Sequence, residues 1–121
     1  MKLLWHILIG IIAFLHMYIL WFEMFSWKTT GRKIFKKYPA EFFNQTGTLA
    51  SNQGLYNGFL AVGLFWSLVI SDPAWKINVA VFFLSCVATA GLYGALTADK
   101  KIFFVQALPA IATLVLTLLI R

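Results

Sequence analysis

Four apolar stretches, each near the length that an α-helix needs to cross a bilayer, constrain this chain more than any other feature. A membrane-spanning helix needs about 20 residues. The stretches are too long and too continuous for the alternating strands of a transmembrane barrel, so they predict helices. The second stretch is the shortest, and its helix is expected to begin earlier, near Thr48. The stretches are Leu3–Phe25, Leu55–Ser71, Ile77–Thr97 and Ile102–Ile120.

The composition supports a membrane protein. Of the 121 residues, 61% are hydrophobic and 12% are charged. A soluble domain of this size leaves too much of its surface wet to hide that many apolar side chains. The first stretch is too long for a cleaved signal peptide and has no A-x-A-like site, so it is expected to stay in the mature chain. The prediction is therefore an all-α, integral membrane four-helix bundle in the bacterial inner or plasma membrane. It forms a single multi-pass membrane domain over 1–121, with helices at about 3–25, 48–71, 77–97 and 102–120.

The net charge of +6 is concentrated at the edges of the apolar stretches. Basic residues there meet lipid headgroups and set the orientation, so nucleic acid is not an expected partner. The loop 26–47 and the loop between the third and fourth stretches carry seven lysines and arginines. The termini and the loop between the second and third stretches, on the opposite side of the membrane, carry three. The positive-inside rule then predicts a cytoplasmic loop 26–47 and both termini on the extracytoplasmic side. The seven are Lys28, Arg32, Lys33, Lys36, Lys37, Lys100 and Lys101, and the three are Lys2, Lys76 and Arg121.

The loop 26–47 is the one substantial polar segment. Its basic stretch interleaves Ile34 and Phe35, and Pro39 with Glu41 is typical of the start of a short helix. We expect this loop to lie along the membrane surface, with membrane lipids as its partners. The alternative is a lid over a polar pocket.

Polar side chains inside the first two apolar segments need partners, because amides and carboxylates are costly in hydrocarbon. His16 and Glu23 are seven residues apart on the first helix, so they share one face. They lie two turns, or roughly 10 Å, apart along the axis, too far for a direct hydrogen bond. Antiparallel packing would bring Glu23 to the same depth as the polar start of the second helix. The predicted ligand-binding set is His16, Glu23, Asn52, Gln53, Tyr56, Asn57 and Gln106.

Other interpretations of this set stay open. The amides and His16 can act as interhelical hydrogen-bonding partners alone, and Glu23 can reach headgroup water. A metal site from His6, His16 and Glu23 has the wrong spacing for ligands on one helix, so no metal or cofactor is expected. The lone Cys86 has no partner for an intrachain disulfide. Four glycines are expected to allow close helix packing, with the first two lying behind the polar face of the second helix: Gly54, Gly58, Gly91 and Gly94.

Nearly the whole chain resembles domain-of-unknown-function family 1304, a family of small membrane proteins. The resemblance implies a four-helix integral membrane protein and brings no activity with it. The most specific string is Asn52-Gln-Gly-Leu-Tyr-Asn-Gly-Phe-Leu-Ala. The other strings are His16, Tyr18-Ile-Leu, Glu23-Met-Phe-Ser-Trp, Pro39-Ala-Glu-Phe, Ala90-Gly-Leu-Tyr-Gly-Ala and Phe104-Val-Gln-Ala-Leu-Pro-Ala.

Three functions are consistent with these residues. The first is binding or transport of a small amphipathic or lipid-like molecule in a pocket near the cytoplasmic interface, with a homo-oligomer completing any transport path. In that case Glu23 supplies the charged or proton-carrying group and His16 an orienting partner. The second is an intramembrane isomerase or transferase acting on a lipophilic substrate, with Glu23 and His16 as its acid–base pair. The third is a structural or regulatory helper that packs against a larger membrane protein through its glycines.

Overall fold

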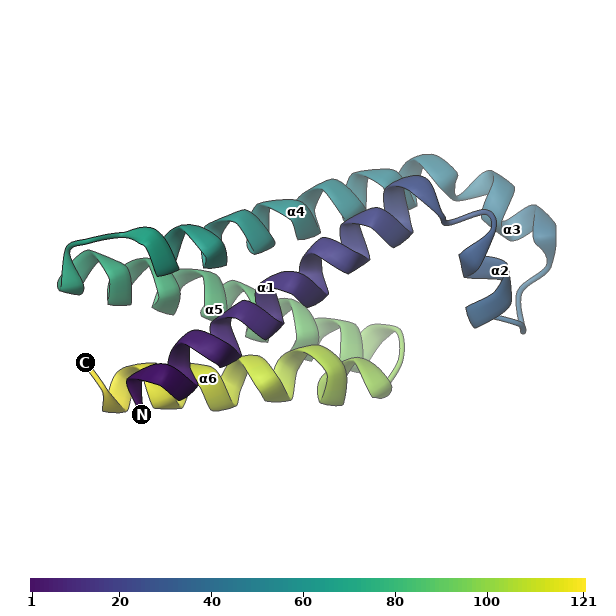
Figure 1. The fold of residues 1–121 in the computed structure, drawn as a ribbon. Helices are drawn as coiled ribbons and strands as arrows, with labels where there is room; N and C mark the ends of the chain where they lie inside the picture. The colour runs from purple at the N-terminus through teal and green to yellow at the C-terminus, as the bar shows by residue number, and fades with distance from the viewer. The chain divides into compact units, whose positions relative to one another are not determined.

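The computed structural model describes residues 1–121, and all of its regular structure is helical. No strand is present, so the predicted all-α class is confirmed. Three long helices and three shorter helical segments are joined by brief connections, and a π-helical turn precedes the last helix (Figure 1). In chain order they are α1 (Lys2–Phe25), α2 (Thr30–Ile34), α3 (Ala40–Gln45), α4 (Gly47–Val69), α5 (Pro73–Thr97), η1 (Phe103–Ala107) and α6 (Leu108–Leu119).

The start of α5 differs from the predicted start at residue 77. The helix begins at Pro73, directly after Asp72, whose carboxylate accepts the Trp75 backbone N–H at 2.8 Å. Proline at the first helical position has no N–H to leave unsatisfied, and an aspartate cap satisfies one of the remaining donors. These polar signals extend α5 beyond the apolar stretch itself.

The fourth apolar stretch is not one continuous α-helix, as the range 102–120 implied. It is a π-helical turn, η1, followed by α6, with Pro109 at the start of α6. The Leu108 N–H bonds to the Phe103 carbonyl, five residues back, as in a π-helix. Pro109 has no N–H to donate to the Val105 carbonyl, so the α-helical pattern is interrupted here. The missing bond at Pro109 is consistent with a π-helical turn directly before it.

Two compact units make up the chain. The first unit contains Met1–Ala13 and Leu60–Arg121, and the second contains Phe14–Phe59. Both α1 and α4 contribute to each unit.

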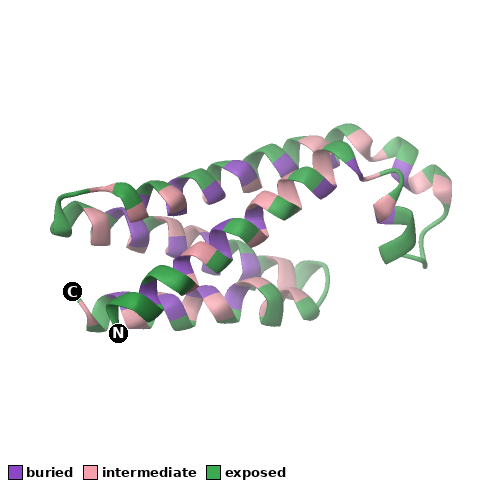
Figure 2. Ribbon diagram, in the orientation of Figure 1, coloured by how far each residue is buried: buried purple, intermediate pink, exposed green.

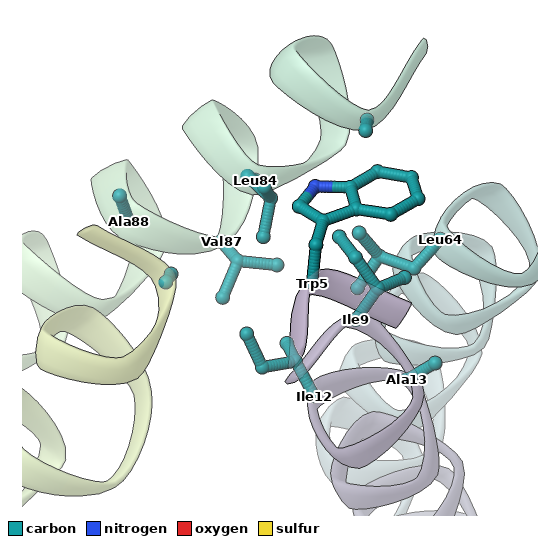
Figure 3. Close-up of a cluster of buried hydrophobic side chains, with 10 residues drawn as sticks. Trp5, Ile9, Ile12, Ala13, Leu64, Leu84, Val87 and Ala88 are labelled. Carbon is teal, nitrogen blue, oxygen red and sulfur yellow. The ribbon is translucent and has the colours of Figure 1, made fainter. Parts of the chain in front are cut away.

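The first unit has an apolar core built from four helices. Figure 3 shows Trp5, Ile9 and Ile12 of α1 gathered between Leu64 of α4 and the pair Leu84 and Val87 of α5. Trp5 is 1% exposed, and its indole N–H donates to the Thr117 hydroxyl of α6 at 2.8 Å. The bond satisfies the one polar atom of the indole, so the large ring can be buried without an unpaired donor. The rest of this core is Ala13, Leu64, Ala80, Ala88 and Ala110.

Close backbone packing joins α5 to η1 in the first unit. A Cβ atom added at Gly91 would lie 2.6 Å from the Ala107 nitrogen and 2.8 Å from its Cα. No side chain fits between two backbones at that separation, so Gly91 is required for this contact. Gly94 lies one turn further along α5 and packs on Ile102, with its added Cβ 3.1 Å from the Ile102 Cγ2.

The second unit holds the loop between α1 and α4 in place with aromatic side chains. Trp27 is central: its indole N–H donates to the Thr46 hydroxyl at 2.9 Å, and its ring centroid lies 5.3 Å from that of Phe43. Phe43 is fully buried and packs on Gly31. The short helix expected after Pro39 is confirmed as α3 with Glu41 in its first turn, whereas α2 was not predicted.

Two helices, α1 and α5, are long and apolar enough to cross a membrane. The helical segment 103–119 is apolar but shorter. Exposed residues recur along the long helices (Figure 2), and many of them are large and hydrophobic, for example Phe14, Phe82 and Leu96. In both α1 and α5, only 28% of the most apolar 18-residue stretch is buried inside the protein. The sides of these helices are therefore largely uncovered apolar surface.

Candidate functional site

Glu23 and Asn57 meet within the second unit. The Asn57 side-chain amide donates to Glu23 Oε1 at 2.8 Å and also to the Gln53 backbone carbonyl at 3.0 Å. Both side chains are half-buried. The contact joins the end of α1 to the first turns of α4, the depth at which antiparallel helices were expected to bring these groups together. A carboxylate has several acceptor positions, so the single bond from Asn57 leaves capacity for another donor.

Glycines let the two helices approach closely at this contact. A Cβ added at Gly54 would lie 2.8 Å from Met24 Cγ and 3.1 Å from the Leu20 carbonyl oxygen. Gly58 packs in the same way on the Leu20 side chain. Gly54 and Gly58 were placed behind the polar face of α4, and this placement is wrong. Residues three and four apart share a helix face, so Gly54 and Gly58 face α1 together with Asn57.

The rest of the amide-rich string lies on exposed parts of α4. Asn52, Gln53 and Tyr56 are exposed, with Tyr56 51% exposed. The Asn52 amide donates to the Thr48 carbonyl of its own helix at 2.9 Å. Asn57 is therefore the one member of the string that bonds to Glu23 through its side chain.

His16 and Gln106 occupy other surroundings. His16 is fully buried in α1, two turns before Glu23. Gln106 is half-buried in the π-helical turn of the first unit, whereas Glu23 belongs to the second unit. A pocket that gathers all seven predicted residues remains a prediction.

A groove of about 540 Å³ lies beside Glu23 within the second unit. Its charged lining residues are Glu23 and Lys28, close to the end of α1. One face of α4 supplies Thr48, Ser51 and Asn52. The groove therefore contains one carboxylate, one ammonium group and several neutral hydrogen-bonding side chains. Its apolar lining residues are Met24, Phe25, Trp27 and Leu55, and Thr29, Asn44 and Gly47 complete it.

Local packing explains how the loop shapes this groove. The methylene chain of Lys28 lies over Gly47, with its Cε 3.1 Å from the position of an added Cβ. Trp27 is anchored by its bond to Thr46, directly before α4 begins. The loop thus folds back so that residues just after α1 face the first turns of α4. This arrangement places an ammonium group and a carboxylate in one concave surface of ordinary ligand-site size.

Sequence reasoning identified Glu23 and Asn52 as site residues but missed Lys28, Thr48 and Ser51. The sequence did contain a pattern that indicates Thr48 and Ser51. Positions 48, 51, 52 and 55 follow the spacing of one helix face, and all four line the groove. Lys28 had been assigned only to the basic loop and to orientation in the membrane.

The Glu23–Asn57 bond should contribute measurably to folding. Replacing each residue with leucine, singly and together, is expected to give a coupling free energy of about 1 kcal/mol, in the usual range for a hydrogen bond within a folded protein. Reversible unfolding in mixed detergent micelles provides the measurement. The matched control is the exposed pair in α3, where the Gln45 amide donates to Glu41 at 3.3 Å. That pair should show coupling near zero, and equal coupling in both pairs would contradict the prediction.

The chain matches the model of one protein family, described as "Protein of unknown function (DUF1304)", over residues 10–118. It is 34% identical over 118 residues to the "Uncharacterized protein YpaA" of Lactococcus lactis subsp. lactis (strain IL1403). That alignment covers 95% of this chain and 97% of the relative. No solved structure matches the chain. Because both the family model and the relative span almost the whole sequence, the chain belongs to the DUF1304 family.

Proposed function

We propose that this protein is a four-helix integral membrane protein that binds a small amphipathic, lipid-like molecule in the groove beside Glu23. The observation that carries the proposal is the lining of the groove, which combines Glu23 and Lys28 with hydroxyl, amide and apolar side chains. Opposite charges in one concave surface suit a zwitterionic headgroup, and the apolar side chains suit its hydrocarbon part.

Placement in the cell membrane is supported by exposed apolar surface. The most apolar stretches of α1 and α5 are only 28% buried, whereas a core helix of a soluble protein is mostly buried. A large uncovered apolar surface marks contact with lipid or with another protein. The helix α4 has 23 residues, also enough to cross a bilayer, although its first turns are polar. The segment 103–119 is then the fourth span, with a π-helical turn near one end.

Binding is favoured over the two other functions. The enzyme hypothesis needs Glu23 and His16 to act on one substrate, but His16 is fully buried and is not among the residues that line the groove. The helper hypothesis needs exposed small-residue faces. Gly54, Gly58 and Gly91 are buried against side chains or backbone of the same chain, so they leave no such face for a partner.

Transport would require more than one copy of the chain. Four helices leave little room for a path across the bilayer, so we propose a homo-oligomer for any transport function. Binding in the groove itself does not depend on that assembly, since all of its lining residues belong to one unit of one chain.

Filling the groove tests the proposal. Ser51 lines the groove, and Ser51→Trp places a large ring in it. The matched control is Leu49→Trp on the same helix, because Leu49 is 67% exposed and lies outside the lining. Native mass spectrometry with added phosphatidylethanolamine should show at least a tenfold loss of affinity for Ser51→Trp, about 1.4 kcal/mol, and none for Leu49→Trp.

The folded state of both variants is checked by size-exclusion chromatography and helical circular dichroism. A second variant, Glu23→Gln, keeps the shape and the Asn57 contact but removes the charge, and it should weaken binding of the same lipid. Lipid binding that is unchanged in Ser51→Trp, or equally reduced in Leu49→Trp, would contradict the groove as the binding site.

A further inference from the structure

A second cavity, of about 440 Å³, lies within the first unit and shares no residue with the Glu23 groove. Three cationic side chains line it: Lys2 at the start of α1, Lys76 in the first turns of α5, and Arg121 just after α6. These residues are far apart in the sequence, and the packing of three helices brings them around one space. Because the cavity collects cations from separate elements, it differs from a run of basic residues on a single surface loop.

The lining of this cavity contains no acidic side chain. The acidic residue nearest in sequence to the lining residues is Asp72. Its carboxylate caps α5 by accepting a hydrogen bond from the Trp75 N–H at 2.8 Å. That cap does not line the cavity. The charged side chains of the lining are therefore all cationic, and an anion is the complementary ligand.

Neutral hydrogen-bonding groups complete the polar side of the cavity. Ser71, Asn78 and His6 belong to its lining. The His6 Nδ1 lies 2.7 Å from the Lys2 carbonyl oxygen, and since a carbonyl can only accept, Nδ1 is the donor. This bond holds the imidazole ring in place beside the cavity. First-turn residues of α5 also line the cavity, and the dipole of that 25-residue helix favours an anion there.

The remaining wall is apolar and fixed. Trp5 belongs to the lining, and its indole is held by the 2.8 Å bond to Thr117. Ile77 and Ile120 add aliphatic surface. The volume of about 440 Å³ exceeds what an inorganic anion needs and falls in the range of organic ligand sites. The wall therefore suits a phosphate that carries an organic group.

We propose that this cavity binds the phosphate group of an organic phosphate, held by Lys2, Lys76 and Arg121 with the organic part against Ile77 and Ile120. Lysine and arginine are the side chains that proteins use for phosphate oxygens. The phosphate can belong to an anionic phospholipid of the surrounding bilayer or to a free phosphomonoester, and the experiment distinguishes the two. The proposal does not depend on the function of the Glu23 groove.

The test compares two charge-matched double variants of the full chain. Lys2→Gln with Lys76→Gln removes two cavity cations, and Lys100→Gln with Lys101→Gln removes two exposed cations outside the cavity. Native mass spectrometry measures binding of phosphatidylglycerol, with phosphatidylcholine as the neutral-headgroup reference. A parallel titration uses glycerol 1-phosphate. The cavity variant should lose affinity about tenfold or more, since each basic residue near an anionic lipid contributes roughly a factor of five. The Lys100/Lys101 variant should lose much less.

Each outcome decides something. Selective loss of phosphatidylglycerol binding identifies a lipid phosphate as the ligand, and selective loss of glycerol 1-phosphate binding identifies a free phosphomonoester. Equal losses in both double variants would show that binding follows net charge, and unchanged binding would show that the cavity is not used; either result overturns the proposal. Lys2→Gln alone, at an exposed position, repeats the test if the double variant fails to fold. The Ser51→Trp variant should bind phosphatidylglycerol normally at this cavity, which separates a failure here from a failure of the groove.

Discussion

Replacing Trp5 with alanine is expected to lower the free energy of unfolding by about 3–5 kcal/mol, the usual cost of deleting a fully buried indole. Trp5 is 1% exposed and packs in the core that joins α1, α4 and α5 of the first unit (Figure 3). The cavity left behind would be lined by Leu64 and Leu84, which are themselves fully buried and cannot easily collapse into it. Reversible unfolding in mixed micelles, followed by circular dichroism, measures the change.

The matched control is Trp75→Ala, which removes the same side chain from a surface position, since Trp75 is 65% exposed. Its effect should stay below about 1 kcal/mol. The variant Trp5→Phe separates packing from hydrogen bonding. It keeps most of the ring but leaves Thr117 without the indole donor, while the Thr117 hydroxyl still donates to the Thr113 carbonyl at 2.7 Å. A Trp5→Ala effect no larger than that of Trp75→Ala would contradict the described core.

The second large effect is expected at Gly91, where a single methyl group should destabilise the fold by roughly 2–3 kcal/mol. In Gly91→Ala the new Cβ would meet the backbone nitrogen and Cα of Ala107 at 2.6 and 2.8 Å. Backbone atoms cannot move aside as the end of a flexible side chain can, so α5 and η1 must separate. The separation would also loosen the neighbouring contact between Gly94 and Ile102.

Gly10→Ala is the control for that substitution. Gly10 lies inside the long helix α1, and an added Cβ there has no neighbour within 4 Å. Alanine is the better helix former, so this variant should be neutral or more stable by up to about 1 kcal/mol. Thermal unfolding of both variants in the same detergent provides the comparison. If Gly91→Ala unfolded at the same temperature as Gly10→Ala, the close packing of α5 on η1 would be wrong.

The sequence predicts the all-α class well because helix length and hydropathy are local properties. Each apolar stretch reports its own helix, whatever its neighbours are. The bounds shift where polar capping groups such as Asp72 extend a helix beyond its apolar part. The interruption at η1 is harder to anticipate, because Pro109 shows that the α-helical bonding fails but not which alternative turn replaces it.

The candidate site is less predictable because it depends on how helices face one another. Depth alone indicates that Glu23 meets the start of α4, and Asn57 does bond to it. The depth of a residue along the helix does not predict which face of α4 packs against α1. That side is set by close packing at Gly54 and Gly58, and it leaves Asn52 and Gln53 exposed. The groove needs in addition the return of the loop, which tertiary packing around Trp27 determines.

The π-helical turn at Phe103–Ala107 has a consequence for changes in chain length. A π-turn holds one residue more than the α-helical turn it replaces, so it resembles a one-residue insertion in a regular helix. Deleting a residue here would convert the π-turn to an α-helical turn and leave the residues on either side facing in nearly their present directions. The same deletion inside α5 would rotate half of a packed helix with no spare residue to absorb it. The segment from Phe103 to Ala107 is thus the place in the first unit where a helix can lose a residue and remain helical, although Ala107 would have to find its place against Gly91 again.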